Sequence, residues 1–65
     1  MKINVFEDKS GTNKNFDVKN LDEIIEKLGI DINNFIIVRN NELITKDSKI
    51  EENDEIRFLS VISGG

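Results

Sequence analysis

The chain opens with alternating polar and apolar residues, the pattern of a strand with one buried face. Ile3 and Val5 fall on one face of this strand, and Phe6 falls on the other. Residues 8–13 are rich in turn-forming side chains, and the alternation resumes over residues 16–18. The pattern therefore predicts a β-hairpin at the start of the chain.

A spacing of three to four residues replaces the alternation after residue 19 and predicts a short helix. Asn20 is placed as its N-cap, and Glu23 three positions later makes an arrangement close to a capping box. Gly29 is placed to end the helix. The spacing puts four apolar residues on one face: Leu21, Ile24, Ile25 and Leu28.

The second half of the chain predicts three more strands. Residues 35–38 form a continuous apolar run, typical of an interior strand covered on both faces or nearly so, and the run does not decide which parity faces the helix. A tight turn at residues 40–41 leads to a brief strand over residues 42–44. Ile50 is expected to plug the core, and the last strand is expected over residues 55–61, with Ile56 and Phe58 pointing inward.

The order strand, strand, helix, strand, short strand, strand predicts an α+β domain of the β-grasp (ubiquitin-like) type. We expect a mixed sheet of four to five strands with one helix packed across one face. The domain is expected over residues 1–61, followed by a flexible C-terminal Gly-Gly tail over residues 62–65. A chain of 65 residues has room for one thin core, so an enclosed active-site cavity is not expected.

Composition narrows the possible chemistry. The chain has no Cys, which excludes disulfides and thiol catalysis, and no His, the usual base near neutral pH and the commonest metal ligand. We therefore predict no catalytic residue and no metal site. No apolar run is long enough to span a membrane, and no secretory leader opens the chain, so we expect a cytoplasmic protein without a membrane partner.

The net charge is −4, and acidic residues crowd the segment 51–55. Nucleic-acid binding requires a basic face, so a nucleic-acid partner is not expected. Glu51, Glu52 and Glu55 either steer a basic protein partner or keep a small protein in solution, and both interpretations stay open. Asp54 is interpreted as a turn former.

The end of the chain carries a family resemblance. Asn53-Asp54-Glu55-Ile56 leads into an apolar strand and the ending Val61-Ile62-Ser63-Gly64-Gly65, and Val38-Arg39-Asn40-Asn41-Glu42-Leu43-Ile44 forms a strand, turn and strand after the helix. In length, strand order and both motifs the chain resembles the ThiS and MoaD family of sulfur carriers. The ending is more similar to ThiS than to MoaD, whose tails tend to carry proline before the glycines. Two residues depart from the family pattern. Ser63 stands where the family often has Ala or a similarly small residue. Arg39 stands where an apolar residue is common, so the third strand is less certain to be buried along its whole length.

The resemblance implies a carrier rather than an enzyme, with no bound cofactor. A partner adenylyltransferase of the ubiquitin-activating type (ThiF/MoeB-like) would use ATP to adenylate the Gly65 carboxylate. Sulfur derived from a cysteine desulfurase would then displace AMP and leave a thiocarboxylate. The acceptor implied by a ThiS-like carrier is thiazole synthase in thiamine biosynthesis.

Two sets of residues would serve this role. The tail residues Ile62, Ser63 and Gly64 would thread a narrow channel in the partner, reaching at most about 14 Å with Gly65. An apolar patch of Phe6, Leu59 and Val61 on the outer sheet face would dock the partner enzymes. Arg39 and Arg57, the two arginines, are interpreted as solvated residues or as polar contacts at the rim of this patch.

Several related functions remain open. The chain also fits the small subunit of molybdopterin synthase, which serves a large catalytic subunit, or a carrier for tRNA thiolation, or a ubiquitin-like modifier of lysines. A different class is a β-grasp interaction module that never uses its terminus.

Overall fold

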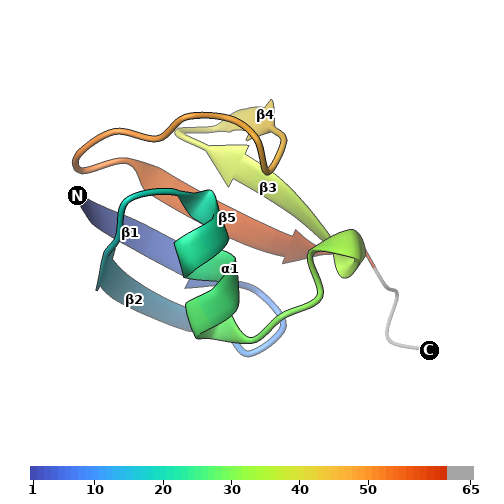
Figure 1. Cartoon of the computed structure of the whole chain (residues 1–65). Helices are drawn as coiled ribbons and strands as arrows, with labels where there is room; N and C mark the ends of the chain where they lie inside the picture. Colours follow the sequence, from blue (N-terminus) through green and yellow to red (C-terminus); the bar gives the residue numbers. More distant parts are fainter. Residues whose placement is uncertain (62–65) are drawn as a thin grey trace.

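The computed structural model describes residues 1–61, and the predicted tail residues Ile62, Ser63, Gly64 and Gly65 lie outside the described part. One α-helix, one 3-10 helix and five strands follow each other along the chain (Figure 1). Their bounds are β1 Lys2–Glu7, β2 Thr12–Asp17, α1 Leu21–Leu28, η1 Ile32–Asn34, β3 Phe35–Arg39, β4 Glu42–Ile44 and β5 Glu55–Ser60.

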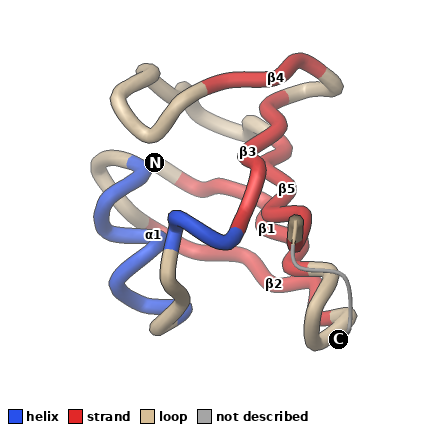
Figure 2. The backbone as a smooth tube through the Cα atoms, turned by 90° about the vertical axis from the view of Figure 1, so that its right-hand side faces the viewer, coloured by secondary structure: helices blue, strands red, loops and turns tan. Residues whose placement is uncertain are grey.

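The five strands form one mixed sheet in the order β2-β1-β5-β3-β4. β1 pairs in parallel with β5 at the centre, and every other pair is antiparallel. Helix α1 and η1 lie on one side of this sheet, as the side view shows (Figure 2). The predicted α+β, β-grasp fold is confirmed, with five strands.

Helix α1 begins and ends where the capping signals predicted. The Asn20 side chain accepts a hydrogen bond from the Glu23 N–H at 3.0 Å, and Gly29 takes the left-handed conformation with φ 66°. The Glu23 carboxylate accepts from the Lys19 N–H at 2.6 Å. A capping box would instead join it to the Asn20 N–H, so the reciprocal half of the motif is shifted by one residue.

The core lies between α1 and the sheet. Its buried apolar residues come from β1, β3, β5, α1 and the segments that join them, and they include Ile50, as predicted. They are Ile3, Val5, Val18, Leu21, Ile24, Ile37, Ile50, Ile56 and Phe58. Because α1 covers only one face, the sheet has an inner face that is buried and an outer face on which no helix or strand of the described chain packs.

The register settles which residues of β3 face the core. Ile37 lies opposite Phe58 and is buried, whereas Ile36 lies opposite Leu59 and is 40% exposed. β3 is an interior strand as predicted, but the expectation that it is covered on both faces or nearly so was wrong, because no helix or strand of residues 1–61 packs on the outer face and Ile36 is exposed there. The last strand ends at Ser60, one residue before the predicted bound of Val61.

The β3–β4 hairpin follows directly from its turn residues. Asn40 and Asn41 have φ values of 50° and 70°, the positive values that a two-residue hairpin turn of this hand requires. Across residues 1–61, no helix is both long and apolar enough to cross a membrane.

Candidate functional site

The end of β5, from which the predicted tail continues, is held from two sides. On one side the Ser60 N–H donates to Asp8 Oδ1 at 2.9 Å, and the Asp8 N–H donates to the Phe58 carbonyl at 3.1 Å. On the other side the Val61 N–H donates to the Asn34 carbonyl at 2.9 Å. The chain is therefore fixed in direction up to Val61, the last residue before the segment that contains the predicted adenylation site, Gly65.

Glu7, the last residue of β1, supports this arrangement through the β1–β2 turn that follows it. Its side chain is buried although it is charged, and its carboxylate accepts from Ser10 Oγ at 2.8 Å and from the Lys9 and Ser10 N–H groups. These bonds hold the turn that presents Asp8 to the end of β5. Sequence reasoning missed this role: Glu7 continues the buried parity of Ile3 and Val5, but the partners of its carboxylate are found only in the folded turn.

The three predicted docking residues fall on or beside the outer sheet face. Phe6 lies opposite Arg57 in the β1–β5 pair, and Leu59 lies opposite Ile36 in the β5–β3 pair. Val61 follows β5 directly and is 51% exposed. The structure thus places Phe6 and Leu59 on one face of the sheet.

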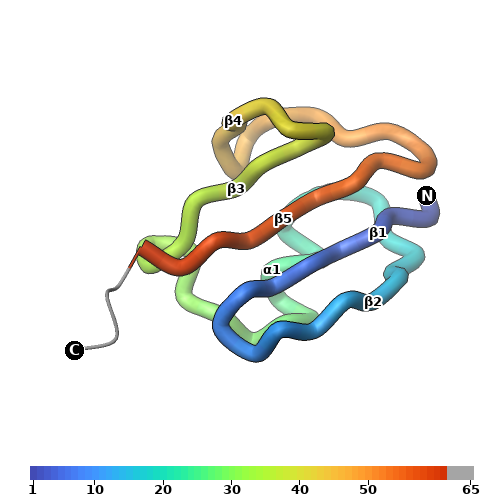
Figure 3. Tube along the Cα trace, turned by 180° about the vertical axis from the view of Figure 1, so that it is seen from behind, coloured from blue at the N-terminus to red at the C-terminus, as the bar shows by residue number. Residues whose placement is uncertain are grey.

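Three further apolar residues join them, and sequence reasoning missed all three. Ile36 and Val38 point outward from β3, and Leu43 of β4 lies opposite Val38 and is 70% exposed. The signal was present in the apolar run at residues 35–38, because a strand with one covered face buries only every second residue. We refer to the set Phe6, Ile36, Val38, Leu43 and Leu59 as the outer patch. Viewed from behind, the sheet with this face lies in front of α1 (Figure 3).

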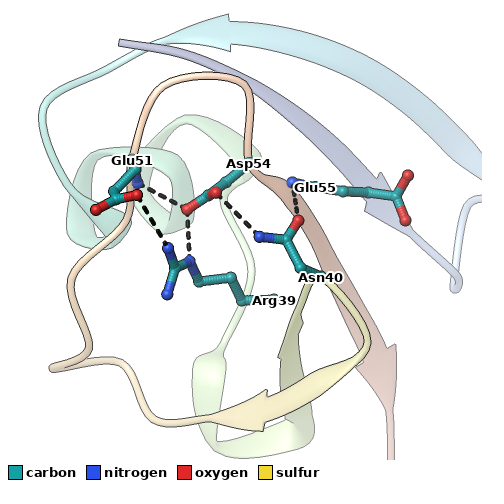
Figure 4. A network of polar contacts seen from close by, with 5 residues as sticks. All are labelled: Arg39, Asn40, Glu51, Asp54 and Glu55. Carbon is teal, nitrogen blue, oxygen red and sulfur yellow. Dashed lines mark hydrogen bonds and ion pairs between the residues drawn. The ribbon is translucent and has the colours of Figure 1, made fainter.

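A polar network occupies the opposite end of β5 (Figure 4). The Asp54 carboxylate is 6% exposed and accepts from Arg39 Nε, from Asn40 Nδ2 at 3.0 Å and from the Glu51 N–H at 2.7 Å. Asn40 Oδ1 in turn accepts from the Glu55 N–H at 2.9 Å. The network ties the β3–β4 turn to the start of β5, so Asp54 does more than form a turn.

The electrostatics of the pair follow from these contacts. Burial alone raises the pKa of Asp54, but the hydrogen bonds from Arg39, the Glu51 N–H and Asn40 outweigh it, and the pKa lies below its ordinary value. The hydrogen bond to Asp54 raises the pKa of Arg39. Arg39 also lies 3.7 Å from Glu51. The interpretation of Arg39 as a solvated residue was therefore wrong, because its position opposite Ile56 at the end of β3 brings it to the buried carboxylate.

The acidic segment lies at the end of the sheet away from the end of β5 (Figure 1). Glu51 pairs with Arg39, Glu52 accepts from the Lys2 N–H at 2.9 Å, and Asp54 is buried. Part of this negative charge therefore serves the fold. Within residues 1–61 no group of three or more Asp, Glu, His or Cys side chains is arranged to hold a metal ion.

Comparisons with known proteins agree with this geometry. The sequence profile of the ThiS family matches residues 7–65. The chain is 40% identical over 45 residues to the sulfur carrier protein TtuB of Thermus thermophilus, and this match covers 69% of each protein. Among solved structures, it superposes on a chain from the complex of subunits 1 and 2 of molybdopterin-converting factor from Helicobacter pylori. That superposition has a TM-score of 0.79 over 100% of both chains at 20% identity, so it shows a shared fold.

Proposed function

Because this chain belongs to the ThiS family and is a small sulfur carrier rather than an enzyme, we propose that Gly65 carries the sulfur as a thiocarboxylate. We further propose that the acceptor is thiazole synthase in thiamine biosynthesis. The observation that carries the proposal is the family match, which covers residues 7–65, from the end of β1 through the Gly64-Gly65 ending. The hydrogen bonds that hold Ser60 and Val61 support it, since they fix the direction of the chain up to Val61, the last described residue before the Gly-Gly ending.

The chemistry of the terminus requires two displacements. At neutral pH the Gly65 α-carboxyl group is ionised, and a carboxylate oxygen attacks the α-phosphate of ATP and expels pyrophosphate. Hydrosulfide sulfur then attacks the acyl carbon, AMP leaves, and a thiocarboxylate remains. If the donor is a persulfide, an acyl disulfide forms first and a second thiol reduces it to the thiocarboxylate.

A partner must supply the catalytic groups, because the chain contains neither His nor Cys. We propose a ThiF/MoeB-like adenylyltransferase for the ATP step and a cysteine desulfurase as the source of sulfur, all in the cytoplasm. The tail residues Ile62, Ser63 and Gly64 would thread the adenylyltransferase channel, where the absence of a Cβ at Gly64 permits close approach. Phe6, Leu59 and Val61 would dock the body beside it, as part of a surface extended by the rest of the outer patch.

A second candidate acceptor is a molybdopterin-synthase large subunit. The fold similarity to a chain of the molybdopterin-converting factor complex favours it, since that relative is seen assembled with a second subunit. The match to TtuB equally suits a carrier that serves another sulfur-accepting enzyme, such as one of tRNA thiolation. All these acceptors share the Gly65 thiocarboxylate, so one experiment tests the common step.

That experiment combines mass and activity. Intact mass of the protein isolated from its native cell is expected to show exchange of one oxygen for sulfur at the terminus. Gly65→Ala and deletion of Gly65 are each expected to abolish ATP–pyrophosphate exchange by the adenylyltransferase, because a Cβ or a shortened tail misplaces the carboxylate. Lys27→Met serves as a fold-neutral comparison, since it changes an exposed side chain of α1, on the side of the sheet away from the outer patch.

The alternatives give different results. An unchanged exchange rate with Gly65→Ala would refute the role of the terminus. Lysine-linked conjugates on a gel would favour the modifier function. An unmodified mass together with no conjugates and no exchange would favour a β-grasp interaction module.

A further inference from the structure

Arg57 lies at the centre of the outer sheet face. It belongs to β5, the middle strand of the five, and points to the same side as the outer patch. Phe6 lies opposite it in β1 and Val38 lies opposite it in β3, so apolar residues flank it on both neighbouring strands. Leu59, two residues further along β5 and opposite Ile36 in β3, extends the apolar surface toward the end of β5.

Within the described residues 1–61, the Arg57 guanidinium group contacts an aromatic ring and forms no ion pair. Its central carbon lies 5.7 Å from the centroid of the Phe6 ring, a distance at which a cation is attracted to the ring face. Among residues 1–61 the ion pairs involve the N-terminus and Arg39, and none involves Arg57. The two arginines therefore differ. Arg39 binds the Asp54 carboxylate, whereas Arg57 points outward from the sheet.

A shallow hollow of about 140 Å³ lies beside this guanidinium. Besides Arg57 and Phe6, it is lined by the amides of Asn4 and Asn13 and by Glu55. The amides and the guanidinium offer hydrogen-bond donors to an acceptor of the size of a carboxylate. Glu55 adds a negative charge to the hollow, which disfavours a doubly charged phosphate group more than a singly charged carboxylate.

We propose that Arg57 is the polar anchor of the outer patch and binds one aspartate or glutamate side chain on an otherwise apolar surface of the protein that takes up the C-terminal tail. A planar guanidinium fork pairs with a carboxylate through two parallel hydrogen bonds, and arginine with aromatic neighbours is typical of interface hot spots. The binding partner is inferred from the position of this surface. The surface extends along β5 as far as Val61, after which the tail begins, so a protein that binds the tail would also contact this face. The inference rests on the proposed function.

The test measures binding of the full chain to a ThiF/MoeB-like adenylyltransferase from the same cell, by calorimetry. Arg57→Met keeps an apolar stem of similar length and is expected to weaken binding about 10- to 100-fold, because one charge-assisted pair is lost. Arg57→Lys keeps the charge without the fork and is expected to weaken binding about 3- to 10-fold. Arg57→Glu, which sets two carboxylates against each other, is expected to weaken binding more than Arg57→Met.

Lys27→Met is the matched control, because it removes the same charge from α1 on the opposite side of the sheet. It is expected to bind within about twofold of the wild type. Thermal unfolding of every variant checks that the exposed substitutions leave the fold intact.

Two results would overturn the inference: Arg57→Met binding within about twofold of the wild type, or Lys27→Met weakening binding as much as Arg57→Met. ATP–pyrophosphate exchange with the wild-type chain separates this failure from that of the proposed function. Normal exchange with unchanged Arg57→Met binding removes only the role of Arg57. Absent exchange and absent binding of the wild type overturn both.

Discussion

Replacement of Asp54 by alanine is expected to destabilise the domain by about 3 kcal/mol. Three hydrogen bonds end on this carboxylate, from Arg39 Nε, Asn40 Nδ2 and the Glu51 N–H, and each is worth about 1 kcal/mol net. The Arg39–Glu51 contact adds little, because the Glu51 side chain is 80% exposed. A domain of this size has a total stability of roughly 3–10 kcal/mol, so the loss would be severe.

A more conservative substitution separates charge from shape. In Asp54→Asn the side-chain oxygen can still accept from Arg39 and the Glu51 N–H, but the new NH₂ group then faces Asn40 Nδ2, also a donor. We expect a loss of about 1–2 kcal/mol. Asp47→Asn removes one negative charge from an exposed loop position and is the matched control, with an expected change within about 0.5 kcal/mol.

The dependence on pH gives a second signature. The pKa of Asp54 is lower in the folded state than in the unfolded chain, where it is about 3.9. Its stabilisation is therefore fully present above the unfolded value and is lost as the pH falls through the folded value. The stability difference between the wild type and Asp54→Asn is expected to be constant from pH 7 to about pH 5 and to shrink below about pH 4.

Urea denaturation, monitored by far-UV circular dichroism at pH 7, 5 and 3, gives the free energy of unfolding of the wild type and of each variant. The expected loss for Asp54→Ala corresponds to a fall in Tm of roughly 12–24 °C. A cost below about 0.5 kcal/mol for Asp54→Ala at pH 7 would show that the network does not stabilise the fold. A difference between the wild type and Asp54→Asn that grows toward acid pH would refute the assigned direction of the pKa shift.

Two other predictions concern the surface and the end of β5. Leu59→Glu is expected to weaken binding to the adenylyltransferase at least about tenfold without unfolding the domain, and unchanged affinity in calorimetry would remove Leu59 from the docking surface. Asp8→Ala is expected to speed hydrogen exchange of the Ser60 amide about tenfold, as its 2.9 Å hydrogen bond to Asp8 Oδ1 is lost. Asp8→Asn keeps an acceptor oxygen and is expected to exchange nearly as slowly as the wild type, and equal exchange in all three proteins would contradict the role of Asp8.

The elements of this fold were predictable because their signals are local. The Asn20 cap, the Gly29 terminator and the Asn40-Asn41 turn each act within a few residues, and each appears in the structure where the sequence placed it. The inward residues Ile3, Val5, Ile56 and Phe58 followed from period-two alternation in strands with one covered face. The Gly64-Gly65 ending, too, was evident from the residues alone, and the family match extends over it.

Only the tertiary structure decided the parity of β3, the role of Asp54 and the setting of Arg57. An apolar run such as residues 35–38 has no alternation, so the side that faces the core depends on the register against β5. The Asp54 network joins residues 15 positions apart, and Arg57 meets Phe6 from the opposite end of the chain. The sequence determined what each segment forms, since local spacing controls that choice. The pairing of strands determined which side chains meet, because register is a property of the assembled sheet.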